Sequence, residues 1–131
     1  MEGFEQSGPS GGAPLAQALD GLWRRFLPEI IARVALLESA VAALGEDGLR
    51  EEQRTEALAA AHKLAGVLGS FGLARGTHLA RELELILTEQ AAPGDTAISS
   101  AATLASAVAA ATELRAVVES RIASAPGSIE K

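Results

Sequence analysis

Apolar residues recur every three or four positions along most of the chain, which is the spacing of one face of an α-helix. The first such stretch runs from Leu15 to Leu44, and Pro28 interrupts it. Proline lacks an amide hydrogen and clashes with the carbonyl four residues earlier. We therefore expect either one helix kinked at Pro28 or a short helix followed by a longer one. The apolar stripe comprises Leu15, Leu19, Leu22, Phe26, Ile30, Val34, Leu37, Val41 and Leu44.

Two further amphipathic stretches follow, from about residue 49 to 70 and from about residue 73 to 90. Because the break between them is very short, the two helices must run antiparallel as a hairpin. Gly72 stands where a left-handed residue can close the first of these helices. Folding the chain about residues 72–73 brings His62 opposite residues 83–84.

A fourth helix is predicted after the break at residues 91–94, with Asp95 or Thr96 as its cap and Ala123 near its end. Its apolar stripe comprises Leu104, Val108, Ala111, Leu114, Val118 and Ile122. Together these stretches predict an all-α protein, an antiparallel up-down four-helix bundle over residues 14–124. We expect residues 1–13 to be disordered, since they are rich in glycine. Residues 125–131 are expected to form a flexible tail or the start of a linker.

Composition and charge narrow the range of functions. The chain has 11 Lys and Arg against 17 Asp and Glu, a net charge of −6, which argues against nucleic acid as the main partner. It has no cysteine, which excludes disulfides and thiolate metal sites. We find no apolar run of the ~18 residues that a membrane span needs, and expect no membrane partner. The acidic N-terminus lacks a signal-peptide pattern, so we expect a cytoplasmic protein.

His62 lies inside the second predicted helix, four residues before Gly66 and seven before Gly69. A glycine in a helix interior costs about 1 kcal/mol relative to alanine, so two of them need a reason. At about 100° per residue, His62 and both glycines share one strip beside the apolar face, together with Thr55 and Ala59. An imidazole that projects from a nearly bare backbone suits a partner that brings its own reactive group close to the ring.

The segment from His62 to Gly66, followed by Phe71 and Gly72, resembles the histidine-containing phosphotransfer (HPt) domain family. The family pattern is histidine, any residue, leucine, lysine and glycine, then a hydrophobic residue and a glycine that close the helix. The resemblance covers about residues 59–87, and Ala65 replaces the family lysine. It implies a phosphoryl carrier rather than an enzyme, with His62 as the phosphoacceptor and no cofactor of its own. The implied partners are a response-regulator receiver domain, which supplies Mg²⁺ and its aspartate, a sensor histidine kinase, or both.

Other residues are given roles by chemistry and position. A reactive imidazole needs one nitrogen free and the other oriented, and a carboxylate that accepts the Nδ1 proton does both. Glu84 is the candidate for this role, at a position where the family often has glutamine. Lys63 or Arg81 could neutralise the phosphoryl oxygens in place of the missing lysine. The positions predicted to contact the partner are Thr55, Ala59, Ala65, Gly66 and Gly69.

Two alternatives stay open. The first is an HPt-like adaptor that binds a receiver domain without being phosphorylated, and Ala65 is the feature that favours it. The second is the dimerisation and phosphotransfer helix pair of a histidine kinase. That pair expects an acidic residue directly after the histidine, where this chain has Lys63. Because four helices can close a core on their own, we expect a monomer.

Overall fold

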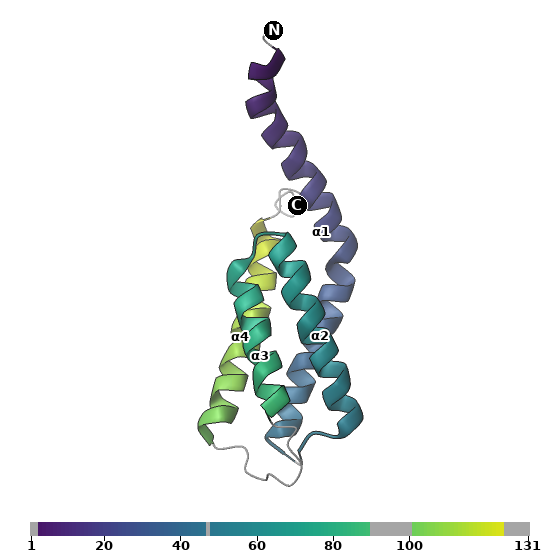
Figure 1. Ribbon diagram of the computed structural model, residues 1–131, viewed down its shortest axis with the longest axis vertical. Helices are drawn as coiled ribbons and strands as arrows, with labels where there is room; N and C mark the ends of the chain where they lie inside the picture. Colours follow the sequence, from purple (N-terminus) through teal and green to yellow (C-terminus); the bar gives the residue numbers. More distant parts are fainter. Residues whose placement is uncertain (1–2, 47, 90–100, 125–131) are drawn as a thin grey trace.

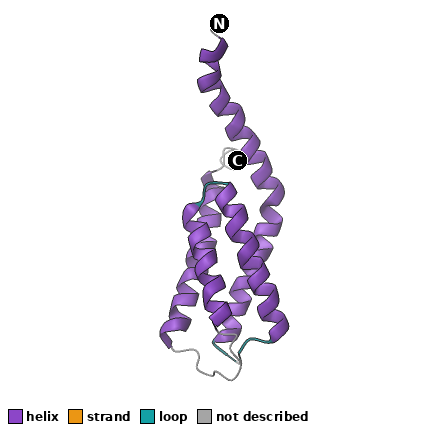
Figure 2. Ribbon diagram, viewed as in Figure 1, coloured by secondary structure: helices purple, strands orange, loops and turns teal. Residues whose placement is uncertain are grey.

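The computed structural model describes residues 3–46, 48–89 and 101–124, with side chains from Pro14 to Ala123. The helices are α1 (Gly3–Leu44), α2 (Glu51–Ser70), α3 (Ala74–Glu89) and α4 (Ala101–Ser124). They alternate in direction, and Figures 1 and 2 show no strand in the described part of the chain. Each helix packs against the next in sequence, and α4 packs back against α1. The predicted all-α up-down four-helix bundle is confirmed.

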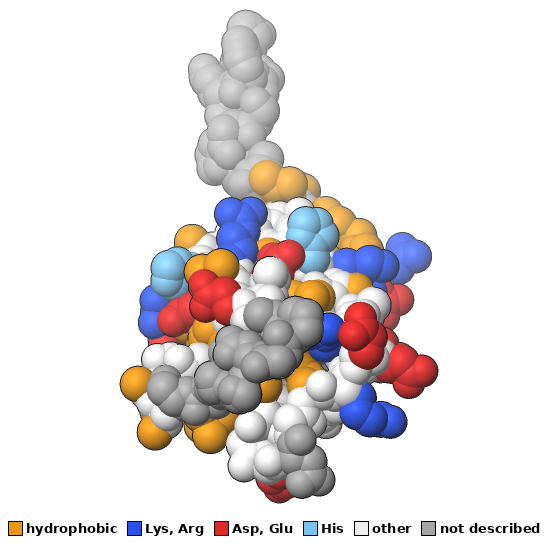
Figure 3. Space-filling view, turned by 60° about the horizontal axis from the view of Figure 1, so that its bottom comes forward, with side chains coloured by type: hydrophobic (Ala, Val, Ile, Leu, Met, Phe, Trp, Pro, Cys, Tyr) orange, Lys and Arg blue, Asp and Glu red, His pale blue; other side chains and the backbone are white. Residues whose placement is uncertain are grey.

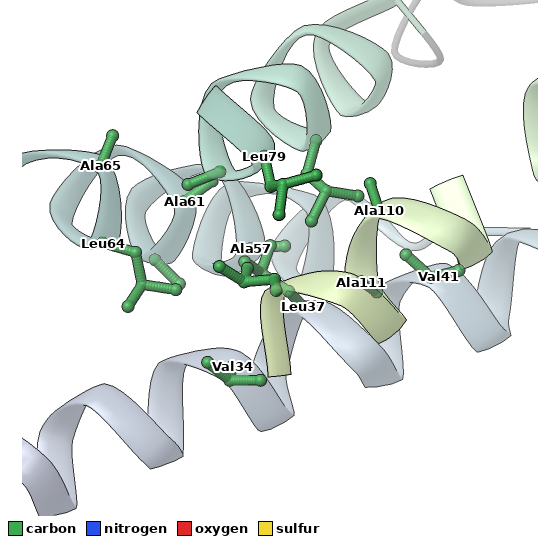
Figure 4. Packing of buried hydrophobic residues seen from close by; sticks show 14 of the residues in the cluster. Val34, Leu37, Val41, Ala57, Ala61, Leu64, Ala65, Leu79, Ala110 and Ala111 are labelled. Carbon is green, nitrogen blue, oxygen red and sulfur yellow. The ribbon is translucent and has the colours of Figure 1, made fainter. Parts of the chain in front are cut away.

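The core is mostly aliphatic, with Trp23 at one end, and draws residues from all four helices (Figure 4). In α1 the buried positions begin at Trp23 and continue through Ile30, Val34, Leu37 and Val41. All predicted core residues of α3 are buried, namely Leu79, Ala80, Leu83, Ile86 and Leu87. Much of the remaining core consists of alanine, which lets the helix backbones approach one another closely.

The predicted apolar stripe of α1 does not lie in the core along its whole length. Leu15, Leu22 and Phe26 are exposed, while Trp23 is buried. Leu22 and Phe26 are exposed because the buried strip of this part of α1 is centred on Trp23, between them. Leu15 is exposed because α1 has 42 residues, whereas the other helices have 20, 16 and 24. The N-terminal part of α1 projects beyond the bundle, as Figure 1 shows, and none of the other described helices covers it. In α4, Val108 is likewise exposed, and its neighbour Ala107 takes the buried place.

Helix α1 passes through Pro28 without a break, so the alternative of two separate helices was wrong. Figure 1 shows one bowed helix. Pro28 is exposed, and the carbonyl that it leaves without a helix hydrogen bond belongs to Arg24, another exposed residue. Water can satisfy that carbonyl, so the proline is tolerated within the helix.

The boundaries of the elements differ from the sequence-based expectation mainly at the N-terminus. The structure begins α1 at Gly3, where disorder was expected over residues 1–13. Helices α2 and α3 begin and end within two residues of the predicted bounds. The predicted cap at residues 95–96 and the tail at 125–131 lie outside the described residues.

Ion pairs tie α4 to its neighbours. Arg115 donates two hydrogen bonds to Glu38 of α1, at 2.6 and 2.9 Å. These bonds hold the pKa of the Glu38 carboxyl below its ordinary value and raise the pKa of Arg115. Arg75 of α3 makes a similar bidentate pair with Glu113, at 2.7 and 2.8 Å. Charged residues therefore fix α4 against both α1 and α3.

The composition of α4 bears on the expected absence of a membrane span. By length and composition alone, Ala101–Ala123 could cross a membrane, with a mean hydropathy of 1.4, which the sequence analysis missed. One such helix is weak evidence, because a helix in the core of a soluble protein can meet the same criterion. Here α4 packs against α1 and α3 and carries the ion pairs of Glu113 and Arg115.

The Glu38–Arg115 pair predicts a pH dependence of stability. The pKa of Glu38 is lower in the folded state than in the unfolded state. The Glu38 carboxylate therefore stabilises the fold fully above its unfolded-state pKa, and this stabilisation is lost as the pH falls through its folded-state pKa. We expect Glu38→Gln to lower the free energy of unfolding by about 0.5–1 kcal/mol at pH 7, since the pair is partly exposed. Urea unfolding at pH 7 and pH 3 measures this, and the difference from the parent should shrink at pH 3. Glu56→Gln, at an exposed carboxylate, is the control; an equal loss at both pH values for Glu38→Gln would contradict the pairing.

Candidate functional site

A tight turn fixes the register between α2 and α3. Gly72 has a φ of +75°, in the left-handed region. The amide of Leu73 donates to the carbonyl of Leu68 at 2.9 Å, and that of Gly72 donates to Gly69 at 3.0 Å. This pair of bonds is the Schellman arrangement that closes helices at a glycine. The predicted role of Gly72 is confirmed, and α3 turns back directly along α2.

The turn brings Glu84 to His62, as the sequence predicts. His62 Nδ1 lies 3.5 Å from Glu84 Oε2. The imidazole is 78% exposed, whereas the Glu84 side chain is 34% exposed. A carboxylate on this side favours the tautomer with the proton on Nδ1. The lone pair of Nε2, on the opposite side of the ring from Nδ1, is then available as a nucleophile.

The strip around His62 is open to solvent. Thr55, Ala59, Gly66 and Gly69 are all exposed, in agreement with the helical projection. The two glycines nevertheless differ. A Cβ added at Gly66 would meet no atom within 4 Å, whereas one at Gly69 would lie 3.3 Å from Thr77 Oγ1. Gly66 therefore keeps the surface beside His62 bare, and Gly69 gives room to α3.

Ala65 is not a surface position, so its inclusion among the partner-contacting residues was wrong. It is 4% exposed and belongs to the core. Its carbonyl accepts a hydrogen bond of 3.0 Å from Thr77 Oγ1 of α3. The cause is the helical spacing, because three residues after His62 the chain has turned about 300° toward the apolar face.

Helix α1 contributes to the site, which was not predicted from the sequence. An open groove beside His62 is lined from α2 by His62, Lys63, Gly66, Val67 and Ser70 and from α1 by Phe26, Glu29 and Arg33. Glu29 and Arg33 form an ion pair of 3.5 Å. The two aromatic residues three positions apart, Trp23 and Phe26, are the signal in the sequence that could have indicated this wall, because such residues are neighbours on one side of a helix.

Aromatic contacts hold this wall in place. The Phe26 and Phe71 rings lie 6.5 Å apart, and the Trp23 and Phe71 rings lie 5.2 Å apart, both pairs edge to face. The guanidinium of Arg121 lies 5.2 Å from the Trp23 ring centre and donates a hydrogen bond of 2.7 Å to Asp20. The groove beside His62 is therefore joined through Phe71 to the core at Trp23.

The predicted cations have different positions. Lys63 is exposed and lines the groove with His62. Arg81 is exposed on α3, one turn before Glu84, and is absent from the lining of that groove. Neither forms an ion pair with another described residue. Figure 3 shows both histidines of the chain on one face, with acidic and basic side chains nearby. Among the described residues there is no group of three potential metal ligands.

Comparison with known proteins gives two matches. The sequence model of the Hpt domain family matches residues 21–120. Protein RcaC of Microchaete diplosiphon is 41% identical over 66 residues, which is 50% of this chain and 10% of that protein. The chain therefore aligns with only about a tenth of this relative's length. No solved structure matches.

The open backbone at Gly66 predicts a conflict between stability and access to His62. We expect Gly66→Ala to raise the free energy of unfolding by about 0.5–1 kcal/mol, because alanine is the better helix former and meets no atom. The same methyl group should hinder a partner that approaches His62, and, on the prediction that His62 is the phosphoacceptor, reduce its phosphorylation by that partner several-fold. Chemical denaturation and a transfer assay measure the two effects.

Gly21→Ala is the matched control, because a Cβ at Gly21 in α1 also meets no atom within 4 Å. It should raise stability by a similar amount and leave phosphorylation unchanged. Equal phosphorylation of the Gly66→Ala and Gly21→Ala variants would show that the partner does not approach over Gly66.

Proposed function

The chain belongs to the Hpt domain family, and we propose that it carries a phosphoryl group on His62 between the aspartates of receiver domains, or from a histidine kinase to a receiver. The family assigns it to histidine phosphotransfer in two-component signalling. The observation that carries the finer proposal is the position of His62, exposed in the middle of α2 with Nδ1 directed to Glu84. Domains of this family are carriers, and we propose the same for this chain rather than an independent enzymatic activity.

The proposed transfer uses the two ring nitrogens differently. Nε2 of the neutral imidazole attacks the phosphorus of an aspartyl phosphate in line, the P–O bond to the aspartate breaks, and a P–N bond forms. The aspartate leaves as a carboxylate, and the proton stays on Nδ1. Glu84 accepts a hydrogen bond from that proton and stabilises the positive charge that develops on the ring. Transfer to the next aspartate is the reverse reaction.

The surface beside His62 suits a docked receiver domain. The groove combines the apolar side chains of Phe26 and Val67 with the bare backbone at Gly66. An apolar patch beside an exposed reactive group lets a partner exclude water while its aspartate approaches. By the family resemblance, we propose that the receiver supplies the Mg²⁺ together with its aspartate. The cytoplasmic location and the monomeric state stay predictions.

One observation favours a second function. Ala65 occupies the position of the family lysine and is buried, so no cation projects from this position. Without that charge the chain could bind a receiver domain without accepting its phosphoryl group. Binding without labelling is the result that distinguishes this adaptor from the carrier.

The carrier is tested by transfer from receiver domains phosphorylated in the presence of Mg²⁺. We expect acid-labile, base-stable phosphate on the parent chain and none on His62→Gln, because His62 alone has the oriented imidazole. His78→Gln is the matched control, since His78 is also an exposed helical histidine, and it should be labelled like the parent. Phosphate that persists on His62→Gln would refute the assignment, and binding without label in the parent would establish the adaptor.

Glu84 gives a separate prediction. We expect Glu84→Ala to slow transfer to His62 by about 10- to 100-fold, because the ring loses the partner of Nδ1. Glu84→Gln should lose less, since its amide oxygen still accepts the Nδ1 hydrogen bond. Single-turnover transfer rates from one phosphorylated receiver measure both, and Glu89→Gln, at another exposed α3 carboxylate, is the control. Equal rates for Glu84→Ala and the parent would exclude an orienting role.

A further inference from the structure

Arg33 of α1 lies at the same level of the bundle as His62. The edge-to-face contact of Phe26 with Phe71 sets the antiparallel register of α1 against α2. Arg33 lies about two helical turns after Phe26 on α1. Because α2 runs in the opposite direction, a similar distance back from Phe71 leads to the region of His62. In agreement with this register, Arg33 and His62 line one groove. His62 therefore has Glu84 on its α3 side and Arg33 on its α1 side.

Arg33 is held in the groove by a contact that can be exchanged. Its Nη1 lies 3.5 Å from Glu29 Oε1, one turn earlier on α1. The Arg33 side chain is 21% exposed, whereas that of Glu29 is 60% exposed. A long ion pair with an exposed carboxylate contributes little free energy. A stronger anion in the groove would therefore compete successfully for the guanidinium.

We propose that the Arg33 guanidinium gives up its ion pair with Glu29 and binds the oxygens of a phosphoryl group on His62. The inference rests on the proposed function of His62 and deepens it by identifying the residue that neutralises the charge. A guanidinium can bond two phosphoryl oxygens at once, which a lysine ammonium cannot do with the same geometry. Arg33 thus replaces the family lysine that is Ala65 here, but from a different helix.

The charges around His62 explain why such a residue is needed. A phosphoryl group on Nε2 adds up to two negative charges near the carboxylates of Glu84 and Glu29. Lys63 lines the groove and Arg81 lies on the flank of α3, and both are exposed. Arg33 is more sheltered from water than a fully exposed side chain, so its attraction to the phosphoryl group is screened less.

The experiment phosphorylates His62 directly and reads the charge of the phosphoryl group. Phosphoramidate transfers its phosphoryl group to Nε2 and releases ammonia, so no partner protein is required. His78→Gln is the parent for all variants, which leaves one histidine. A ³¹P NMR titration then gives the pKa of the second phosphoryl ionisation, which a nearby cation lowers.

We expect Arg33→Ala to raise this phosphoryl pKa by about half a unit, the size of one partly screened charge near the phosphate. Glu29→Gln removes an anion and frees Arg33, so it should lower the pKa. Arg33→Lys should restore most of the shift, which a purely structural role of Arg33 would not explain. Circular dichroism of each variant checks that the bundle stays folded.

Three results would overturn the proposal. If Arg33→Ala titrates like the parent, Arg33 does not bind the phosphoryl group. If Lys63→Ala produces the whole shift instead, the neutralising charge lies on α2. If phosphoramidate gives no phosphohistidine in the parent, the proposed function of His62 fails and this inference with it, so the two failures are distinguishable.

Discussion

The site depends on the turn at Gly72. An exposed histidine on a helix has no defined chemistry until a second group holds one of its nitrogens, and here that group comes from the following helix. The left-handed residue and the two bonds that close α2 let α3 begin at Ala74, so no flexible loop enters between the histidine and its carboxylate. The contact of Thr77 with the Ala65 carbonyl then fixes the two helices in one register.

This construction separates the rigid part of the site from the accessible part. Below His62 the core is closed by Leu64, Ala61 and Leu83, which are fully buried. Above it the backbone at Gly66 is bare. A reacting group that must meet a large partner is best placed on a fixed helix whose own surface does not obstruct the approach. Gly66 therefore lowers the stability of α2 but keeps His62 accessible, whereas Gly69, one turn away, lets α3 pack closely.

Most of the fold and half of the site could be predicted from the sequence. The three- to four-residue spacing gave the four helices, and the short break at Gly72 gave the hairpin and hence the pair of His62 and Glu84. The α1 wall could not be predicted in the same way, because long-range register depends on how α1 packs, and α1 carries two overlapping apolar stripes. Only the packing shows that Trp23 is buried and Phe26 faces the groove. The prediction that Ala65 contacts the partner was wrong for a simpler reason. The family resemblance suggested a surface position, but the helical spacing from His62 places Ala65 on the apolar face.

The burial of Ala65 has a consequence for how charge reaches this site. Ala65 is 4% exposed, so the position of the family lysine lies in the core of this bundle and not on its surface. An alanine there lets α2 and α3 approach closely, but Lys63 is then the one cation that α2 contributes to the groove beside His62. The remaining cation in the groove belongs to α1, whose position is set by the contacts of Trp23 and Phe26 with Phe71. Since Phe71 closes the end of α2, the packing that aligns α1 also determines the electrostatics at His62.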